Sequence, residues 1–387
     1  MKSNWKEERL GSLVRFSSGG TPNKNNPDYW NGTIPWISAK NMKSEVIETS
    51  DLSITEEGLI HGSKIAPKGS LLLLVRGSGL FNGIPVCYLE NAVAYNQDVK
   101  CIESTSELEN KYLFYWLKAN SGYLRKKIEF TSIGAGKFDT RFLSNLVVRF
   151  PDIVTRKKII DMADNISDRI NINKKINENL QEQAKAIFSK MIIEEADESW
   201  APGVLSDIAI VTMGQSPKGD TYNEDGVGTV FFQGRAEFGF RFPTQRLSTT
   251  DPKRMARVND ALMSVRAPVG DMNVAYEDCC IGRGLAAIHS KDGHQSFVLY
   301  TMFNLREELN VFNGEGTVFG SINRDALNSM PISIPPKKVR DKFEAVVSPM
   351  DAAIRNNYDE ICRLEVIRDS LLPRLMSGEL DVSELNL

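Results

Sequence analysis

Two arginines stand directly after apolar runs that have the length of a β-strand. Arg76 follows residues 71–75 and precedes a glycine, and Arg266 follows residues 261–265 and precedes an alanine and a proline. A guanidinium at the end of a strand can hold guanine or a phosphate through two parallel hydrogen bonds. A structural ion pair with a carboxylate of the same domain fits each arginine equally well. The pattern therefore indicates either a ligand-binding cation or an internal ion pair.

Polar, basic and aromatic residues also gather in turn-rich segments, at 17–30 and at 213–226. Glycine and proline let such loops approach a ligand closely. Hydroxyl, amide, basic and aromatic side chains are the groups that contact phosphates and base edges in nucleic acids. A solvated surface loop is the alternative. The candidate DNA-binding residues are Thr21, Asn23, Lys24, Tyr29, Lys40, Arg76, Asn96, Gln97 and Lys137 in the first half, and Ser216, Lys218, Tyr222, Gln233, Arg235, Arg266, Arg283 and Arg324 in the second.

Some of these candidates come from positions that recur in both halves. Gln97 follows Asn96, and Arg283 stands between two glycines at the equivalent place. The glycine-rich segments 133–138 and 314–324 contain Lys137 and Arg324, which are phosphate contacts or parts of plain turns.

Motifs of catalysis are missing or incomplete. The string "NPDY" at 26–29 lacks the second proline of the Asn-Pro-Pro-Tyr signature of methyltransferases, and no glycine-rich cofactor loop follows a strand and opens a helix. The strings "DVK" at 98–100 and "DPK" at 251–253 have the carboxylate-x-lysine form of metal-dependent nucleases, but no second acidic cluster supports them. We therefore expect a protein with no catalytic residues, no cofactor and no metal of its own.

Length and composition set further limits. A chain of 387 residues is expected to form two or more domains. No run approaches the roughly 20 apolar residues of a membrane span, and the N-terminus has no apolar signal region, so we expect a cytoplasmic protein without a membrane partner. The net charge of −3 gives no global affinity for nucleic acid. DNA binding would need local basic patches or help from a partner.

The sequence repeats itself. The offset is 195 residues near the two tryptophans, 190 at the two arginine-bearing runs, and 184 from residue 142 onward, so the second copy has lost residues in loops. Five residues of the first copy, Trp5, Leu10, Leu13, Gly19 and Pro22, match Trp200, Leu205, Ile208, Gly214 and Pro217. Apolar strand-like runs with variable loops predict a mixed α/β (α+β) fold of two related domains, each followed by one long helix.

Each long helix carries an apolar seam. Apolar residues recur at spacings of four and three through 159–191 and 343–375, which is a heptad pattern that one helix alone cannot bury. We expect the two helices to pair as an antiparallel coiled coil; packing of each helix on its own domain is the alternative. The predicted seam contains Ile166, Ile170, Asn173, Leu180 and Ile187 in the first helix, and Met350, Ile354, Asn357, Leu364 and Leu371 in the second.

The second helix contains a proline near its end. Pro373 lacks an amide donor and is expected to kink or end the helix there, while Gly378 provides a stop signal. The predicted domains are therefore a first recognition domain at 1–155, a central helix at 156–194, a second recognition domain at 195–338, a distal helix at 339–377 and a tail at 378–387.

Segments 258–288 and 319–336, together with "LLPRLMSGEL" at 371–380, resemble the specificity subunit of type I restriction-modification systems. The resemblance covers essentially the whole chain, including the duplication of a target-recognition domain followed by a helical spacer. The family's Pro-Leu-x-Glu-Gln element at the helix starts is replaced here by "PDIVTRKK" and "PPKKVRDK".

The resemblance implies a non-catalytic protein that selects a bipartite sequence in double-stranded DNA. It implies that two methyltransferase (modification) subunits bind this chain and that restriction/translocase subunits join them. S-adenosylmethionine, ATP and Mg would then be bound by the partner subunits. The alternative is a non-catalytic protein-protein scaffold whose duplicated domains are mounted on a coiled coil.

Overall fold

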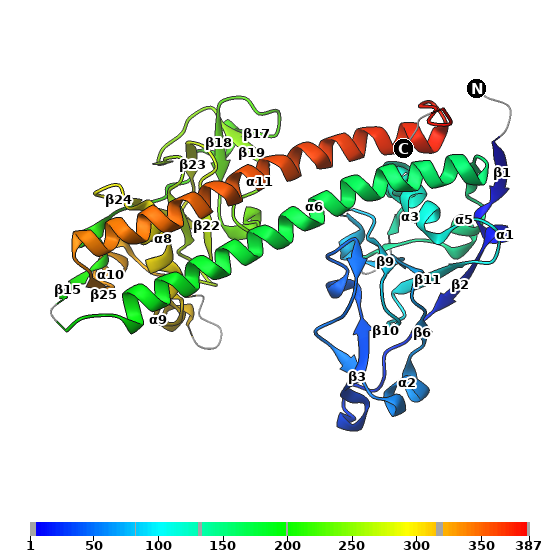
Figure 1. The fold of residues 1–387 in the computed structure, drawn as a ribbon, viewed down its shortest axis with the longest axis horizontal. Helices are drawn as coiled ribbons and strands as arrows, with labels where there is room; N and C mark the ends of the chain where they lie inside the picture. The colour runs from blue at the N-terminus through cyan, green and yellow to red at the C-terminus, as the bar shows by residue number, and fades with distance from the viewer. Residues whose placement is uncertain (1–4, 82, 131–133, 199, 315–319, 385–387) are drawn as a thin grey trace. The chain divides into compact units, whose positions relative to one another are not determined.

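The computed structural model describes residues 5–81, 83–130, 134–198, 200–314 and 320–384. The chain divides into two compact units. Unit 1 contains Met1–Ile172 and Glu360–Leu387, and unit 2 contains Asn173–Asp359. Within the described ranges, no helix combines the length and the apolar character that a membrane span requires. Figure 1 labels the elements of both units.

Unit 1 combines four small sheets with short helices. The strands pair in the orders β1-β14, β5-β3-β10-β6, β2-β11-β7-β9-β4 and β12-β13-β8. Strands are β1 Lys6–Arg9, β2 Val14–Ser18, β3 Trp30–Ile37, β4 Val46–Ile47, β5 Ser53–Ile54, β6 Ile65–Ala66, β7 Leu71–Leu74, β8 Arg76–Gly77, β9 Val86–Leu89, β10 Val93–Tyr95, β11 Val99–Ser104, β12 Glu129–Phe130, β13 Gly136–Lys137 and β14 Val147–Phe150. Helices are α1 Leu10–Leu13, η1 Pro27–Tyr29, η2 Ala39–Asn41, α2 Glu56–Gly62, η3 Ser78–Phe81, α3 Asn110–Ala119, α4 Ser121–Arg125 and α5 Thr140–Ser144.

Unit 2 repeats much of this arrangement. Its strands pair in the orders β15-β25, β16-β24-β21-β22 and β17-β19-β18-β23-β20. Strands are β15 Ala201–Val204, β16 Ala209–Met213, β17 Tyr222–Asn223, β18 Thr229–Phe232, β19 Leu247–Thr249, β20 Met255–Ala256, β21 Ala261–Ser264, β22 Met272–Val274, β23 Cys279–Ile281, β24 Leu285–Ser290 and β25 Pro331–Ile334. Helices are α7 Leu205–Ile208, η5 Gly219–Thr221, η6 Arg235–Glu237, α8 Gln295–Asn304, α9 Arg306–Asn310, η7 Val311–Asn313 and α10 Arg324–Asn328.

Matching strand pairs in the two units show the predicted duplication. In unit 1, β11 lies between β2 and β7 in antiparallel pairing, and in unit 2 β24 lies between β16 and β21 in the same way. A parallel pair also recurs, β3 with β10 and β18 with β23. The four residues of β7 are fully buried, as expected for a strand covered on both faces. The prediction of two related α/β domains is therefore confirmed.

Two long helices are shared between the units. Helix α6 spans Ile153–Phe188 and continues as a π-helix at Ser189–Glu194, and α11 spans Lys337–Ser377. Within each unit the two helices lie side by side and run antiparallel (Figure 1). In unit 1, Arg169 Nε donates to Glu360 Oε1 over 2.9 Å. In unit 2, the rings of Phe188 and Phe343 lie 5.6 Å apart. The coiled-coil pairing is thus confirmed.

The residues of the predicted seam lie at this helix pair with different degrees of burial. Ile170, Asn173 and Ile354 are buried. The partly buried members are Ile166, Leu180, Ile187, Met350, Asn357, Leu364 and Leu371. The buried polar pair in unit 2 joins Asn357 to Asn177, because Asn357 Nδ2 donates to Asn177 Oδ1 over 2.8 Å. Asn177 Nδ2 in turn donates to the carbonyl of Ile354 over 3.2 Å.

Replacing one member of this amide pair should lower the free energy of unfolding more than replacing both. Asn177→Leu leaves the Asn357 amide without its acceptor and should lower the free energy of unfolding by about 1–3 kcal/mol. The double substitution with Asn357→Leu should recover most of that loss, since two apolar side chains then meet in the seam. Chemical denaturation of the two single variants and the double variant measures the coupling. Asn356→Leu, at an exposed neighbouring position, is the matched control.

The end of α11 excludes one of the two alternatives expected for Pro373. The helix does not end at the proline but continues for one more turn to Ser377. Leu372, Leu375 and Met376 are buried in the core of unit 1, and this packing holds the last turn. Gly378 follows with φ +75°, so the predicted stop signal is found where a left-handed residue is needed.

Candidate nucleic-acid interface

A glycine at the same place in each unit allows a loop to contact the end of a neighbouring strand closely. A Cβ at Gly19 would lie 1.9 Å from the carbonyl oxygen of Tyr95, and a Cβ at Gly214 would lie 2.1 Å from that of Gly282. The next residue in each loop donates its N–H to that strand end, Gly20 to Tyr95 and Gln215 to Ile281, both over 2.9 Å. Only glycine permits this approach. The loops predicted at 17–30 and 213–226 are therefore fixed by main-chain contacts.

In unit 1 this contact brings Thr21 to Gln97. The hydroxyl of Thr21 donates to Gln97 Oε1 over 2.7 Å. Asn96 is 6% exposed, and its Oδ1 accepts the N–H of Asp98 over 3.1 Å. Asn96 therefore holds the turn that presents Gln97 to solvent.

Arg76 lies next to this turn. Its N–H donates to the carbonyl of Asp98 over 3.2 Å, and it stands directly opposite Lys137 in the β8–β13 pair. Arg76 is exposed and Lys137 is partly buried. Among the residues that the structure describes, the Arg76 guanidinium forms no ion pair, so the internal ion pair considered for it is not observed there. Residue 133 of the glycine-rich segment 133–138 lies outside the described residues.

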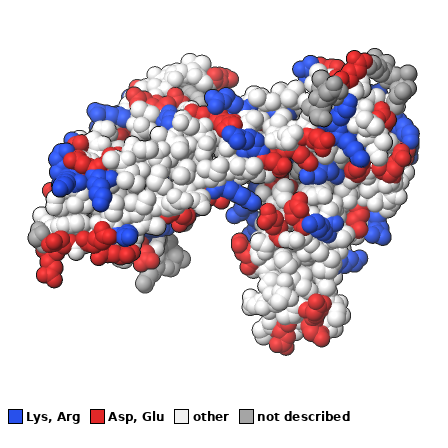
Figure 2. Space-filling model, viewed as in Figure 1, with Lys and Arg blue, Asp and Glu red and all other residues white. Residues whose placement is uncertain are grey.

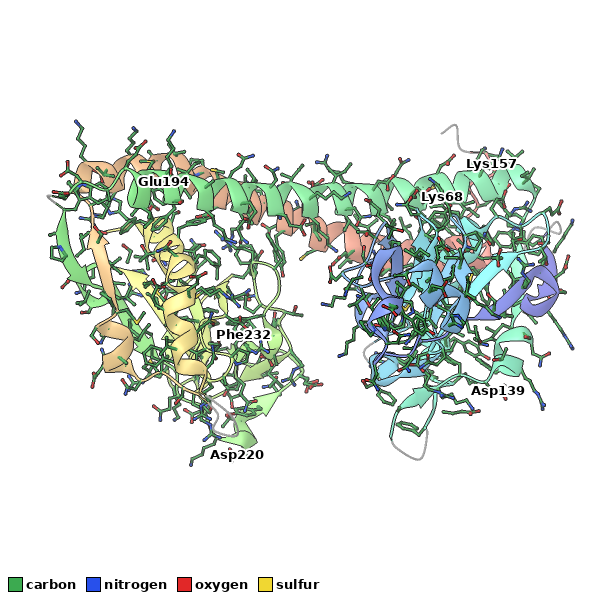
Figure 3. All side chains as sticks on the ribbon, turned by 90° about the horizontal axis from the view of Figure 1, so that it is seen from below. Lys68, Asp139, Lys157, Glu194, Asp220 and Phe232 are labelled. Atoms are coloured by element: carbon green, nitrogen blue, oxygen red, sulfur yellow. The ribbon has the colours of Figure 1, made fainter. Side chains whose placement is uncertain are left out.

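Unit 2 gathers the equivalent residues. The N–H of Arg283 donates to Ser216 Oγ over 3.3 Å, and the N–H of Gly282 donates to the carbonyl of Phe232 over 2.8 Å. The exposed Gln233 directly follows Phe232, so Ser216, Gln233 and Arg283 surround the ends of β18 and β23. In Figure 3, Phe232 lies within this unit. Asp220, which belongs to the same loop as Ser216, lies at the end of the unit away from Glu194 and α6.

Arg266 lies beside the same strand ends. The N–H of Val265 donates to the carbonyl of Gly284 over 3.0 Å, which places the residue after Val265 beside Arg283. Arg266 itself pairs with Ser321 in an isolated bridge. The guanidinium groups of Arg266 and Arg283 are exposed and form no ion pair within the described part of the chain. Residues 315–319 of the glycine-rich segment 314–324 lie outside it.

Four of the remaining candidates have structural contacts. Tyr29 stacks on His61 at 5.5 Å, and Asn23 Oδ1 accepts the N–H of Asn25 over 3.0 Å. The hydroxyl of Tyr222 donates to the carbonyl of Pro217 over 2.9 Å. Arg235 forms an ion pair with Asp271, which also binds Arg306 over 2.7 Å. The exposed candidates on loops or helix starts are Lys24, Lys40, Lys218 and Arg324.

Two positions at these edges are missing from the sequence-based set. Ser38 follows β3 as Gln233 follows β18, and Ser321 faces Arg266 as Lys137 faces Arg76. The offset of 195 residues would have pointed to Ser38, and extending the offset of 184 residues a few residues upstream of 142 would have pointed to Ser321. The face in Figure 2 carries acidic and basic groups side by side in each unit.

A hollow in unit 1 is lined in part by charged groups that pair with one another. It lies between α3 and α11, and its lining includes Glu45, Lys118, Arg368 and Asp369. These charges neutralise one another, because Glu45 pairs with Lys118 and with Arg368, and Arg368 also pairs with Asp369 over 2.8 Å. Across the described ranges, no group of three His, Cys, Asp or Glu side chains could hold a metal ion.

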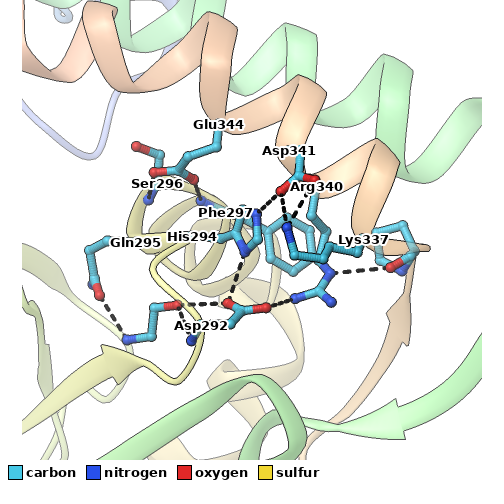
Figure 4. A network of polar contacts seen from close by, with 11 residues as sticks. Asp292, His294, Gln295, Ser296, Phe297, Lys337, Arg340, Asp341 and Glu344 are labelled. Atoms are coloured by element: carbon cyan, nitrogen blue, oxygen red, sulfur yellow. Dashed lines mark hydrogen bonds and ion pairs between the residues drawn. The ribbon is translucent and has the colours of Figure 1, made fainter.

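A polar cluster in unit 2 ties the start of α8 to the start of α11 (Figure 4). His294 lies between two carboxylates, 2.9 Å from Asp292 and 2.8 Å from Asp341. Asp292 also pairs with Arg340. Glu344 accepts the N–H groups of residues 296 and 297, each over 3.1 Å. The cluster is structural, since its charged groups form ion pairs with one another.

The acid stability of unit 2 should depend on this cluster. Burial raises the pKa of Asp292, but the hydrogen bond from His294 and the charge of Arg340 outweigh it, and the pKa falls from 3.8 to about 2. A depressed folded-state pKa stabilises the fold above about pH 4, and the contribution is lost as pH falls through about 2. The pKa of Glu344 is raised, chiefly by burial, so its ionisation acts in the opposite direction.

Asp292→Asn should therefore lower the free energy of unfolding at pH 5, and its difference from the unmodified chain should shrink steadily toward pH 2. Denaturant unfolding at a series of pH values measures this difference. Glu344 is present in both proteins, so its opposite contribution cancels in the comparison. A difference that stays constant from pH 5 to 2 would contradict the assignment.

The fold and the repeated strand-end groups define a class of protein with two related recognition domains on a pair of long antiparallel helices. The model of the type I restriction modification DNA specificity domain matches residues 2–182. The chain is similar to specificity subunits of type I restriction-modification systems over nearly its whole length.

Three such subunits and one solved structure illustrate this similarity. The MjaX and MjaIX specificity subunits of Methanocaldococcus jannaschii are 27% and 24% identical, over 98% and 99% of this chain and 94% and 95% of theirs. The EcoR124I/EcoR124II specificity subunit of Escherichia coli is 30% identical over 41% of this chain and 40% of its own. The type I S subunit from M. genitalium has a similar fold, with a TM-score of 0.54 and 16% identity over 97% of this chain and 98% of that one.

Proposed function

We propose that this chain is the non-catalytic subunit that chooses the DNA target of a type I restriction-modification complex. Each unit binds one half of a bipartite sequence in double-stranded DNA. The observation that carries the proposal is the repetition of one strand-end arrangement, Thr21 with Gln97 and Ser216 with Arg283, in two units with different side chains. Two related but chemically different sites suit two different half-sites.

The proposal extends to the partners and the domain limits. Two methyltransferase subunits bind this chain, and restriction/translocase subunits complete the nuclease. S-adenosylmethionine, ATP and Mg belong to those partners, and the complex works in the cytoplasm. Residues 1–155 and 195–338 are the two recognition domains, residues 156–194 and 339–377 are the spacer helices, and residues 378–387 are the tail.

The test is to produce the full chain together with its methyltransferase subunit in a host that lacks this modification, and to map modified bases across the genome. A two-part motif with an unread gap is the expected result. A single uninterrupted motif, or modification without sequence preference, would contradict the proposal. DNA binding measured with and without the methyltransferase subunit separates it from the alternative of a protein-protein scaffold, which would bind no DNA in either case.

A further inference from the structure

The residue that lies two positions after the central parallel strand occupies the same place in both units. Gln97 follows β10 and Arg283 follows β23 at this spacing. The two strands pair in parallel with β3 and β18, and their last residues, Tyr95 and Ile281, face the last residues of those partners. Position 97 and position 283 are therefore one structural position with two different side chains.

A hydroxyl from the glycine-seated loop contacts this position in each unit, but in a different way. Thr21 donates to the side chain of Gln97, at Oε1, over 2.7 Å. Ser216 instead accepts the main-chain N–H of Arg283 over 3.3 Å. Thr21 is thus a positioning residue for the Gln97 amide, whereas Ser216 fixes the main chain and leaves the Arg283 side chain unconstrained.

Both side chains offer polar groups to solvent. Gln97 is exposed, and its amide keeps two N–H donors and a second lone pair on Oε1 after the contact with Thr21. Arg283 is exposed, and in the described ranges its guanidinium has no carboxylate partner. Arg76 lies beside the turn in unit 1 and Arg266 beside the turn in unit 2, so each position is flanked by a cation suited to phosphate.

The chemistry of the two side chains differs in a way that matches the two purines. An amide donates to N7 and accepts from the N6 amino group of adenine, and a guanidinium donates to both O6 and N7 of guanine. We propose that Gln97 reads an adenine in the half-site of unit 1 and that Arg283 reads a guanine in the half-site of unit 2. This assignment rests on the proposed function of DNA recognition.

Exchange of the two side chains tests the assignment. The full chain carrying Gln97→Arg or Arg283→Gln is produced with the methyltransferase subunit, and its modified sites are mapped. Gln97→Arg should change one adenine to guanine in one half of the motif, and Arg283→Gln should change one guanine to adenine in the other half. The half-site read by the unaltered unit should stay the same in each case.

Matched controls lie near the opposite ends of β10 and β23. Ala92 directly precedes β10 and is exposed, so Ala92→Arg adds the same guanidinium as Gln97→Arg at the opposite end of the strand. Arg257 follows β20, whose residue Ala256 pairs with Cys279 at the start of β23. Arg257→Gln therefore repeats the Arg283→Gln change away from the proposed contact. Both controls should keep the motif of the unmodified chain.

A second measurement covers variants that modify too little DNA to map. Duplexes in which 7-deazaguanine replaces guanine in the half-site of unit 2 lack the N7 acceptor. The complex with the unmodified chain should bind such a duplex more weakly, by less than the roughly 150-fold expected for loss of a whole bidentate contact, because O6 still accepts one hydrogen bond. The complex with Arg283→Gln should bind the natural and the 7-deaza duplexes equally.

The outcomes separate this inference from the proposed function. If the unmodified chain gives no two-part motif, the proposed function fails. If it gives one and both exchange variants keep it unchanged, the base-reading assignment alone is wrong. A uniform loss of affinity for all sequences in Arg283→Gln, with full sensitivity to 7-deazaguanine retained, would assign Arg283 to a phosphate and also overturn the inference.

Discussion

Arg156→Met is expected to lower the free energy of unfolding of unit 1 by about 3–5 kcal/mol, the usual cost of leaving a buried charge without its partner. Arg156 is 2% exposed. Its guanidinium donates to Glu109 Oε2 over 2.8 Å and to the carbonyls of Pro151 and Glu107 over 3.0 and 3.1 Å. Substitution by methionine keeps the volume of the side chain but leaves all three acceptors unpaired. Thermal and chemical denaturation of the full chain measures the loss.

Arg169→Met is the matched control for this prediction. Arg169 also forms a two-point ion pair, to Glu360 over 2.9 and 3.2 Å, but its side chain is 56% exposed. Because water replaces the lost contacts at an exposed site, stability should change little. Equal losses of stability in the two variants would show that burial of the Arg156 ion pair does not determine how much it stabilises the fold.

Gly214→Ala should destabilise unit 2 by about 2 kcal/mol or more and should remove recognition of its half-site. The added Cβ would lie 2.1 Å from the carbonyl oxygen of Gly282, so either the loop or the β23 end must move. Either movement displaces Ser216 and Arg283 from each other. Denaturation measures the stability, and mapping of modified sites should show loss of specificity in one half of the motif.

Gly219→Ala in the same loop provides the comparison. A Cβ at Gly219 meets no atom within 4 Å, so the same substitution should be accepted without loss of stability or of the motif. Normal recognition by the Gly214→Ala variant would show that the close approach of the loop is not needed to form the site.

The duplication and the long helices could be predicted because each leaves a periodic signal in the sequence. Within matching strands the two copies keep one offset in residue number, and the offset changes only in the loops between them. An apolar seam along a helix indicates that a second helix packs against it. The pairing of Asn357 with Asn177 had no such signal. The axial register of two antiparallel helices depends on the domains between them, so a heptad pattern alone does not say which amides meet.

The candidate site could be predicted only in part, for a related reason. The alignment of Gly19 with Gly214 and of Arg76 with Arg266 pointed to strand ends that are equivalent in the two units. Composition could not show that Asn96 is buried in its turn or that Arg235 binds Asp271, 36 residues further along the chain. Contacts of this kind depend on tertiary neighbours, and a loop sequence does not specify them.

The way in which the two loops are held has a consequence for how such a protein can evolve. The hydrogen bonds that seat them, Gly20 to Tyr95 and Gln215 to Ile281, use main-chain atoms alone. The side chains at positions 97 and 283 contribute nothing to these bonds. Under the base-reading role proposed for positions 97 and 283, a lineage could therefore acquire a new DNA preference by single substitutions there while keeping these main-chain bonds.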